Sequence, residues 1–180
     1  MTISPQQAAE ALRDVRDVES RSRELAGYEQ GARHFFLWGG IWIVGYGVSG
    51  LDPSYSVVWL PLAILGWLAS AIMGLRTPRA KGVNRKIGFS TIVAVVFTVA
   101  VVAVLRPTGA NDIAALPPLV LAGAYCIAGV WALPRYFWIG AGIFALTLGG
   151  YFLLAPWFSF WMAGVGGGAL LLSGLWLLKA

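Results

Sequence analysis

Few side chains in this sequence could take part in catalysis or bind a metal. The chain has one histidine, His34, and one cysteine, Cys126. A zinc site needs three or four His, Cys or carboxylate ligands, and an internal disulfide needs two cysteines. Hydroxyl groups occur within the apolar segments, but no base lies at the same depth to activate one as a nucleophile. No GxSxG, HExxH, CxxC or P-loop pattern occurs. We therefore expect no catalytic residues, no bound metal and no cofactor.

Two carboxylates lie beyond the N-terminal region, at Asp52 and Asp112. Asp52 precedes Pro53, and Asp112 follows Gly109 closely. Both combinations are typical of turns. We interpret the two carboxylates as turn residues, the alternative being an active site at the outer surface of a membrane.

A basic segment without acidic residues covers residues 76–86. Its charges are Arg76, Arg79, Lys81, Arg85 and Lys86. Pro78 and Gly82 disfavour a helix here. Polybasic segments beside a membrane attract anionic headgroups, with about 1 kcal/mol per charge near the surface. We expect these charges to hold the topology, or to contact lipid headgroups or a partner.

Small residues recur every four positions in the last two apolar segments. They are Ala141, Ala145, Gly149, Gly164 and Gly168. This spacing lets two helices in a membrane approach closely. We expect these residues to pack helices together, either within the bundle or between copies of the chain. Leucine at Ala145 or Gly168 should then weaken helix association.

Six apolar segments must position these residues. They cover residues 35–51, 54–75, 87–105, 114–133, 136–155 and 157–178. Each has roughly the 17 to 25 residues that cross a bilayer. None contains Asp, Glu, Lys, Arg, His, Asn or Gln, and Pro156 separates the last two. The sequence predicts an all-α, polytopic integral membrane protein with six transmembrane helices in residues 34–180.

The charges predict how this bundle is oriented. If the six segments are threaded through a membrane in order, twelve of the thirteen Lys and Arg residues fall on the side of the N-terminus, and only Arg106 falls on the other. Basic residues near span ends stay on the cytoplasmic face. Both termini should therefore be cytoplasmic. The ten Arg against three Lys, with abundant Gly and Ala, favour a bacterial plasma or inner membrane.

Residues 1–33 differ from the rest and predict a cytoplasmic amphipathic helix. Apolar and small residues recur at steps of three and four: Ala8, Ala11, Leu12, Val15, Val18, Ser22, Leu25, Tyr28 and Ala32. The charged face pairs acid before base at i and i+4, as in Glu29 with Arg33. Three roles stay open: a solvated extension of the first span, a surface for a partner or for self-association, and a helix lying on the membrane.

These features favour a small non-catalytic membrane sensor, scaffold or accessory subunit that contacts a cytoplasmic partner through residues 1–33. The alternative is a transporter or channel for a neutral or apolar solute, and a lipid-modifying enzyme comes third. Proton coupling through intramembrane acids is not expected, because the apolar segments contain no ionisable acid. The basic pI of about 9.7 is explained by the cytoplasmic segments, so we expect no nucleic-acid binding.

The charge distribution yields a topological prediction. Reporter fusions after Leu51 and at Asn111 should report an external location, and fusions after Lys81 and at the C-terminus a cytoplasmic one. The measurement is the activity of a paired set of compartment-specific reporters at each site. An external C-terminus would contradict the six-span count.

Overall fold

The structure, a computed structural model, describes residues 5–75, 81–131 and 133–179. This part of the chain is helical with short connections and contains no strand. Its elements are α1 (Pro5–Leu51), η1 (Pro53–Val58), α2 (Trp59–Leu75), α3 (Lys81–Leu105), α4 (Ala110–Trp131), α5 (Pro134–Leu153), η2 (Ala155–Trp157), α6 (Phe158–Trp161), η3 (Met162–Gly166) and α7 (Gly167–Leu178). The predicted all-α class is confirmed.

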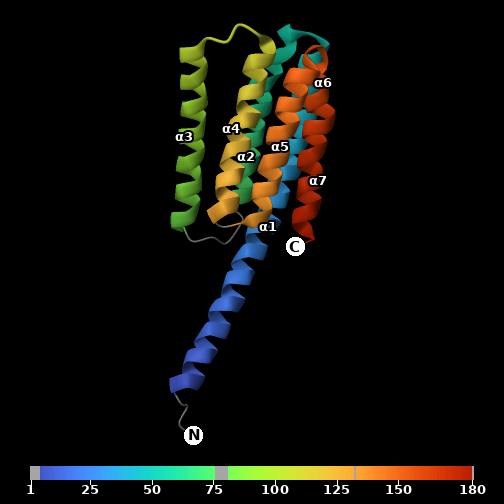
Figure 1. Ribbon diagram of the computed structural model, residues 1–180. Helices are drawn as coiled ribbons and strands as arrows, with labels where there is room; N and C mark the ends of the chain where they lie inside the picture. The colour runs from blue at the N-terminus through green and yellow to red at the C-terminus, as the bar shows by residue number, and fades with distance from the viewer. Residues whose placement is uncertain (1–4, 76–80, 132, 180) are drawn as a thin grey trace.

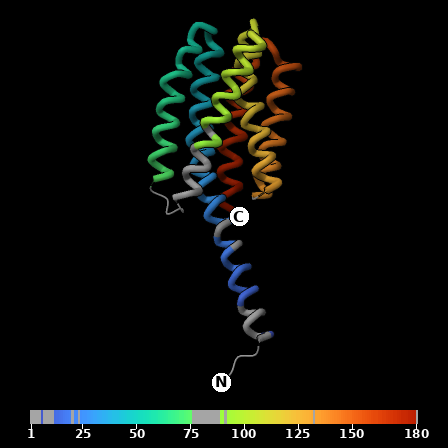
Figure 2. Tube along the Cα trace, turned by 90° about the vertical axis from the view of Figure 1, so that its left-hand side faces the viewer, coloured from blue at the N-terminus to red at the C-terminus, as the bar shows by residue number. Residues whose placement is uncertain are grey.

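Helix α1 is one unbroken helix of 47 residues, about 70 Å long at 1.5 Å per residue. No proline lies between Pro5 and Pro53, so no residue in between lacks the amide hydrogen that a helix needs. Its C-terminal half lies in the bundle and its N-terminal half projects beyond it (Figure 1). The same projection is visible from the side of α3 (Figure 2). The helix therefore continues without a break across the border predicted between the N-terminal helix and the first span.

Prolines define three of the connections between helices. Asp52 has an extended backbone, with φ −154° and ψ 131°, and its carboxylate accepts a hydrogen bond from the Ser54 amide at 2.7 Å. Pro53 then begins η1, which confirms Asp52 as a turn residue. Pro134 begins α5, and Pro156 lies in η2 between α5 and α6. The residue before a proline disfavours the helical region, and proline itself fits a first turn.

The bundle contains two closely packed helix pairs. Helix α4 packs most extensively on α5, and α1 packs most extensively on α7. Helices α2 and α3 are peripheral: α2 is buried only at Gly66, and α3 makes few contacts with α4. The C-terminus lies at the end of the bundle from which α1 projects (Figure 1).

Four segments of the described chain are long and apolar enough to cross a membrane, by length and composition. They are Pro53–Leu75, Ala110–Trp131, Pro134–Leu153 and Ala155–Leu178. Large apolar side chains cover the outside of α2 and α3, including Leu60, Trp67, Phe89 and Phe97. This surface indicates a membrane-embedded protein, because its apolar residues have no protein cover.

Of the five small-residue positions, Ala145 and Gly164 are exposed, whereas Ala141, Gly149 and Gly168 are half-buried. Ala145 lies about 200° around α5 from the buried Ile143, whereas Ala141 and Gly149 directly adjoin the buried Gly140 and Gly150. A Cβ atom built at Gly149, Gly164 or Gly168 would meet nothing within 4 Å. No backbone approach as close as that expected inside the bundle is therefore seen at these glycines, and their role in helix packing stays a prediction. Packing between copies of the chain stays a prediction.

Other glycines provide the close contacts. A Cβ at Gly140 would lie 2.6 Å from the Ala122 carbonyl oxygen and 2.8 Å from the Cys126 amide nitrogen, so α4 and α5 touch through their backbones. A Cβ at Gly167 would lie 2.6 Å from Ile43 Cγ1, where α7 meets α1. Both helix pairs thus depend on a missing side chain at the point of contact.

These contacts predict opposite outcomes at neighbouring glycines. Gly140→Ala and Gly167→Ala should each cost about 1 to 3 kcal/mol of stability, because the added methyl group overpacks a close contact between two helices. Gly142→Ala and Gly168→Ala are the matched controls, since a Cβ at either meets nothing within 4 Å. They should be neutral, or stabilising by up to about 1 kcal/mol through helix propensity. Melting temperatures in one detergent give the comparison, and equal losses in both pairs would contradict it.

Candidate functional site

The predicted basic segment lies only partly in the described chain. Arg76 and Arg79 fall outside the described residues, as do the side chains of Lys81, Arg85 and Lys86. The backbone of the last three belongs to the first turns of α3. The expectation that Pro78 and Gly82 keep the whole segment non-helical is therefore wrong from Lys81 onward. Pro78 precedes the helix, and one glycine costs only about 1 kcal/mol in a helix of 25 residues.

Charged and aromatic side chains from α1, α5 and α7 meet where α1 leaves the bundle. We call Glu24, Tyr28, Arg135 and Trp176 the exit clamp. The Arg135 guanidinium lies 5.4 Å from the Tyr28 ring centroid and 5.3 Å from that of Trp176. It also donates a hydrogen bond of 2.7 Å to the Trp176 carbonyl. One side chain at the start of α5 thus contacts both α1 and α7.

Tyr28 connects the exit clamp to the projecting half of α1. Tyr28 is 3% exposed, and its hydroxyl donates a hydrogen bond of 2.7 Å to Glu24. Burial, followed by the hydrogen bond to Glu24, raises the pKa of Tyr28 above its ordinary value. The phenol therefore stays protonated and donates at neutral pH. Any stability from this protonated state is present below the ordinary tyrosine pKa and is lost at higher, alkaline pH.

Aromatic rings continue the contact into the bundle. Tyr28 stacks on Tyr136 with centroids 6.5 Å apart, and Phe35 lies 5.6 Å from Tyr136 and 5.2 Å from Tyr125. The Tyr136 hydroxyl packs against Gly31, where a side chain would collide with it. The projecting helix is therefore joined to the bundle by rigid rings rather than by a flexible linker.

A second polar contact lies deeper in the bundle, between α1 and α4. Helix α4 contains Pro117 and Pro118 in its interior. Pro118 has no amide hydrogen, so the Ala114 carbonyl four residues earlier loses its usual helical partner. The buried Tyr46 hydroxyl donates to this carbonyl at 2.7 Å. A side chain of α1 thus replaces the donor that α4 lacks.

The end of the bundle opposite the exit clamp is tied together by Asn111 and Asp112. Asn111 donates to the Ala155 carbonyl at 2.7 Å. The Asp112 carboxylate accepts from the Gly109 amide at 3.1 Å, as expected of a turn residue, and from the Tyr151 hydroxyl at 2.5 Å. Asp112 also borders a mainly apolar crevice of about 330 Å³ between α4 and α5.

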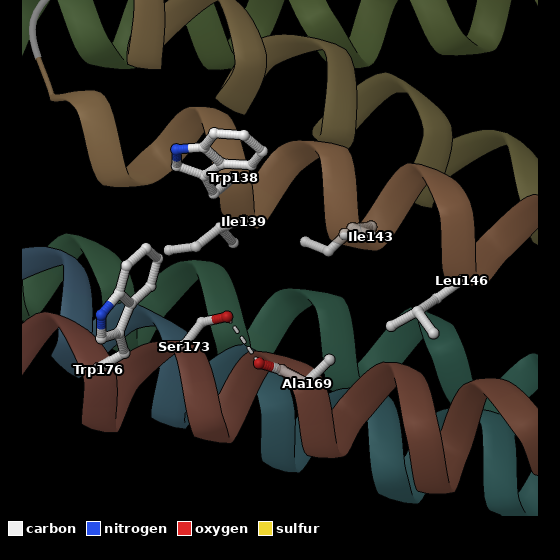
Figure 3. A pocket seen from close by; sticks show the side chains of 8 residues that line it. Trp138, Ile139, Ile143, Leu146, Ala169, Ser173 and Trp176 are labelled. Carbon is white, nitrogen blue, oxygen red and sulfur yellow. Dashed lines mark hydrogen bonds between the residues drawn. The ribbon is translucent and has the colours of Figure 1, made fainter.

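A smaller groove of about 170 Å³ runs between α5 and α7 (Figure 3). Trp138, Ile143 and Leu146 line it from α5, and Ser173 and Trp176 line it from α7. The Ser173 hydroxyl donates to the Ala169 carbonyl at 2.7 Å within its own helix. Because the Ser173 hydroxyl already donates its proton within α7, the groove presents an apolar wall suited to hydrocarbon.

No group of three or more His, Cys, Asp or Glu residues that could hold a metal occurs among the described residues. Comparisons with protein-family models, with curated proteins and with solved structures give no match. The case for a function therefore rests on the geometry of this chain.

Sequence reasoning missed both the exit clamp and the Tyr46 contact. The charge pattern assigns Arg135 no role beyond orienting the bundle in the membrane. Its place one residue after Pro134, however, puts it at the start of a helix. The proline pair in an otherwise helical segment signals a free carbonyl. It does not show which of the six tyrosines supplies the donor.

The Tyr46 contact predicts a specific double-mutant cycle. Tyr46→Phe should cost about 1 to 3 kcal/mol, because it leaves the buried Ala114 carbonyl without a partner. Pro118→Ala restores a backbone amide for that carbonyl, so Tyr46→Phe should cost clearly less in the Pro118→Ala background. The measurement is the free energy of unfolding in detergent. Tyr55→Phe, at a tyrosine 51% exposed, is the control. A Tyr46→Phe cost independent of Pro118 would rule out this explanation.

Proposed function

We propose that this chain is a six-span membrane protein with both termini in the cytoplasm. It acts without catalysis, as a sensor, scaffold or accessory subunit that contacts a cytoplasmic partner through the projecting half of α1. The twelve-to-one distribution of basic residues supports the orientation. The position of the C-terminus at the end from which α1 projects agrees with an even number of crossings.

The observation that carries the proposal is a row of exposed apolar side chains on the projecting helix. We call Leu12, Val15, Val18 and Leu25 the exposed stripe. Their exposed fractions are 59%, 54%, 65% and 51%. This part of α1 lies beyond the bundle, so the rest of the chain does not cover the stripe. Aligned apolar residues on a solvated helix are typical of a surface that packs on a partner helix.

The exit clamp gives the projecting helix a fixed relation to the bundle. Because α1 is continuous and Tyr28, Ala32 and Phe35 are buried at its entry, a force on the exposed stripe acts on the bundle core. This arrangement suits a protein that reports a change in its membrane-embedded part to a cytoplasmic partner. The basic segment, on the same side, would contact anionic lipid headgroups or the same partner.

Site-specific photo-crosslinking in cells tests this proposal. A photoreactive residue at Val15 or Val18 should yield a discrete adduct with another protein. The same residue at Arg13 or Asp17, which are exposed and lie about 160° around α1 from Val15, should yield several-fold less. Adducts are separated by size and identified by mass spectrometry.

The outcomes distinguish the roles left open for this helix. Adducts between two copies of the chain would make the stripe a self-association surface, while adducts with lipid alone would place the helix on the membrane. Equal yields from all four positions would leave α1 as a solvated extension and contradict the proposal.

A further inference from the structure

We propose that the crevice between α4 and α5 binds an aminophospholipid, with the lipid ammonium at Asp112 and part of an acyl chain along the apolar wall. The crevice lies at the end of the bundle away from the projecting helix. The inference needs only that the chain is embedded in a membrane, and not the orientation or the partner proposed above.

The shape and lining of the crevice fit a lipid segment. Its volume of about 330 Å³ is at the lower end of the range for small-ligand sites. Seven of the ten lining residues are apolar: Leu105, Pro107, Ala115, Leu116, Leu119, Leu148 and Phe152. Leu105 and Phe152 are 68% and 72% exposed, so the crevice opens sideways toward the surroundings of the bundle, where acyl chains lie in a membrane.

The polar groups of the crevice leave one charge without a counterion. The Thr147 hydroxyl donates to the Ile143 carbonyl of its own helix, and the Tyr151 hydroxyl donates to Asp112. The Asp112 carboxylate offers about four acceptor positions and uses two of them, for Tyr151 and Gly109. No described cation lies within ion-pair distance of it. A primary ammonium group supplies both a positive charge and N–H donors.

Arg106, beside the crevice in sequence, suits the phosphate of the same zwitterionic headgroup. Arg106 lies between Leu105 and Pro107 in sequence, and both of these line the crevice. Its backbone is in the left-handed region at φ 45°, and its side chain is exposed without a hydrogen-bond partner in the described chain. A headgroup with its ammonium at Asp112 therefore has a guanidinium available for its phosphate.

Lipid retention measured by native mass spectrometry tests the assignment. The full chain is purified in nanodiscs that contain equal parts of phosphatidylethanolamine, phosphatidylcholine and phosphatidylglycerol, and is then released with its bound lipids. The wild-type chain should retain phosphatidylethanolamine over phosphatidylcholine, whose methylated ammonium has no N–H donor. Asp112→Asn should reduce this preference about tenfold, the loss expected for a hydrogen bond to a charged group.

Two further variants keep the result interpretable. Asp52→Asn removes the other carboxylate of the same end, which lies outside the crevice at the start of η1, and should leave the preference unchanged. Leu116→Trp fills the crevice without changing any charge and should abolish retention of phosphatidylethanolamine. It decides the question if Asp112→Asn fails to fold, since Asp112 also holds Tyr151 and Gly109.

Four results would overturn the inference. One is equal retention of phosphatidylethanolamine and phosphatidylcholine by the wild-type chain, and another is an unchanged preference in both Asp112→Asn and Leu116→Trp. Preferential retention of phosphatidylglycerol would show that phosphate, and not ammonium, is recognised. Displacement of the lipid by millimolar free phosphoethanolamine would equally contradict it, because the acyl chain would then contribute nothing.

Discussion

The need to satisfy every backbone polar group without water governs this structure. Inside a bilayer, a carbonyl left free by a proline must find a protein partner. Pro118 leaves the Ala114 carbonyl of α4 free, and Tyr46 of α1 supplies the donor. Because that bond fixes the depth of Tyr46, it also fixes the rings around it, with Trp59 at 4.8 Å, Trp42 at 5.7 Å and Phe158 at 6.5 Å. One missing amide hydrogen thus sets the register between α1, α4 and the start of α6.

Around this point, the bundle has a closely packed centre and a loose periphery. The α4–α5 and α1–α7 pairs approach through Gly140 and Gly167, whereas α2 and α3 present large side chains outward. In a membrane, apolar surface alone does not drive helices together, so backbone proximity and shape determine which helices pair. The same loose periphery leaves the crevice beside Asp112 open to lipid. Close packing and lipid access are therefore divided between different helices of one small bundle.

Helix α1 makes the two ends of the molecule different. Its apolar half is held by the Tyr46 contact and by α7, its exit from the bundle is held by Arg135, and its remaining length carries the exposed stripe. Asp112 and its crevice lie at the opposite end. A lipid bound there would contact α4 and α5, and α4 in turn holds α1 through Ala114. The structure thus places a chain of direct contacts between a lipid-facing site and the surface proposed for a cytoplasmic partner.

The sequence by itself determined the helical class, the membrane setting, the turns at Asp52 and Pro156, and the helical form of residues 5–33. These depend on local chemistry: apolar segments of sufficient length, prolines at helix starts, and short-range capping. Only the tertiary structure decided which glycines touch a neighbour, since the four-residue spacing of Ala141, Ala145 and Gly149 is the same on a buried face as on an outer one. It also decided the partners of Arg135, Tyr46 and Asp112. The hydrogen-bond partners of these three residues on other helices are 41, 68 and 39 residues away in sequence, respectively. Only the rotation and depth of each helix bring the groups together.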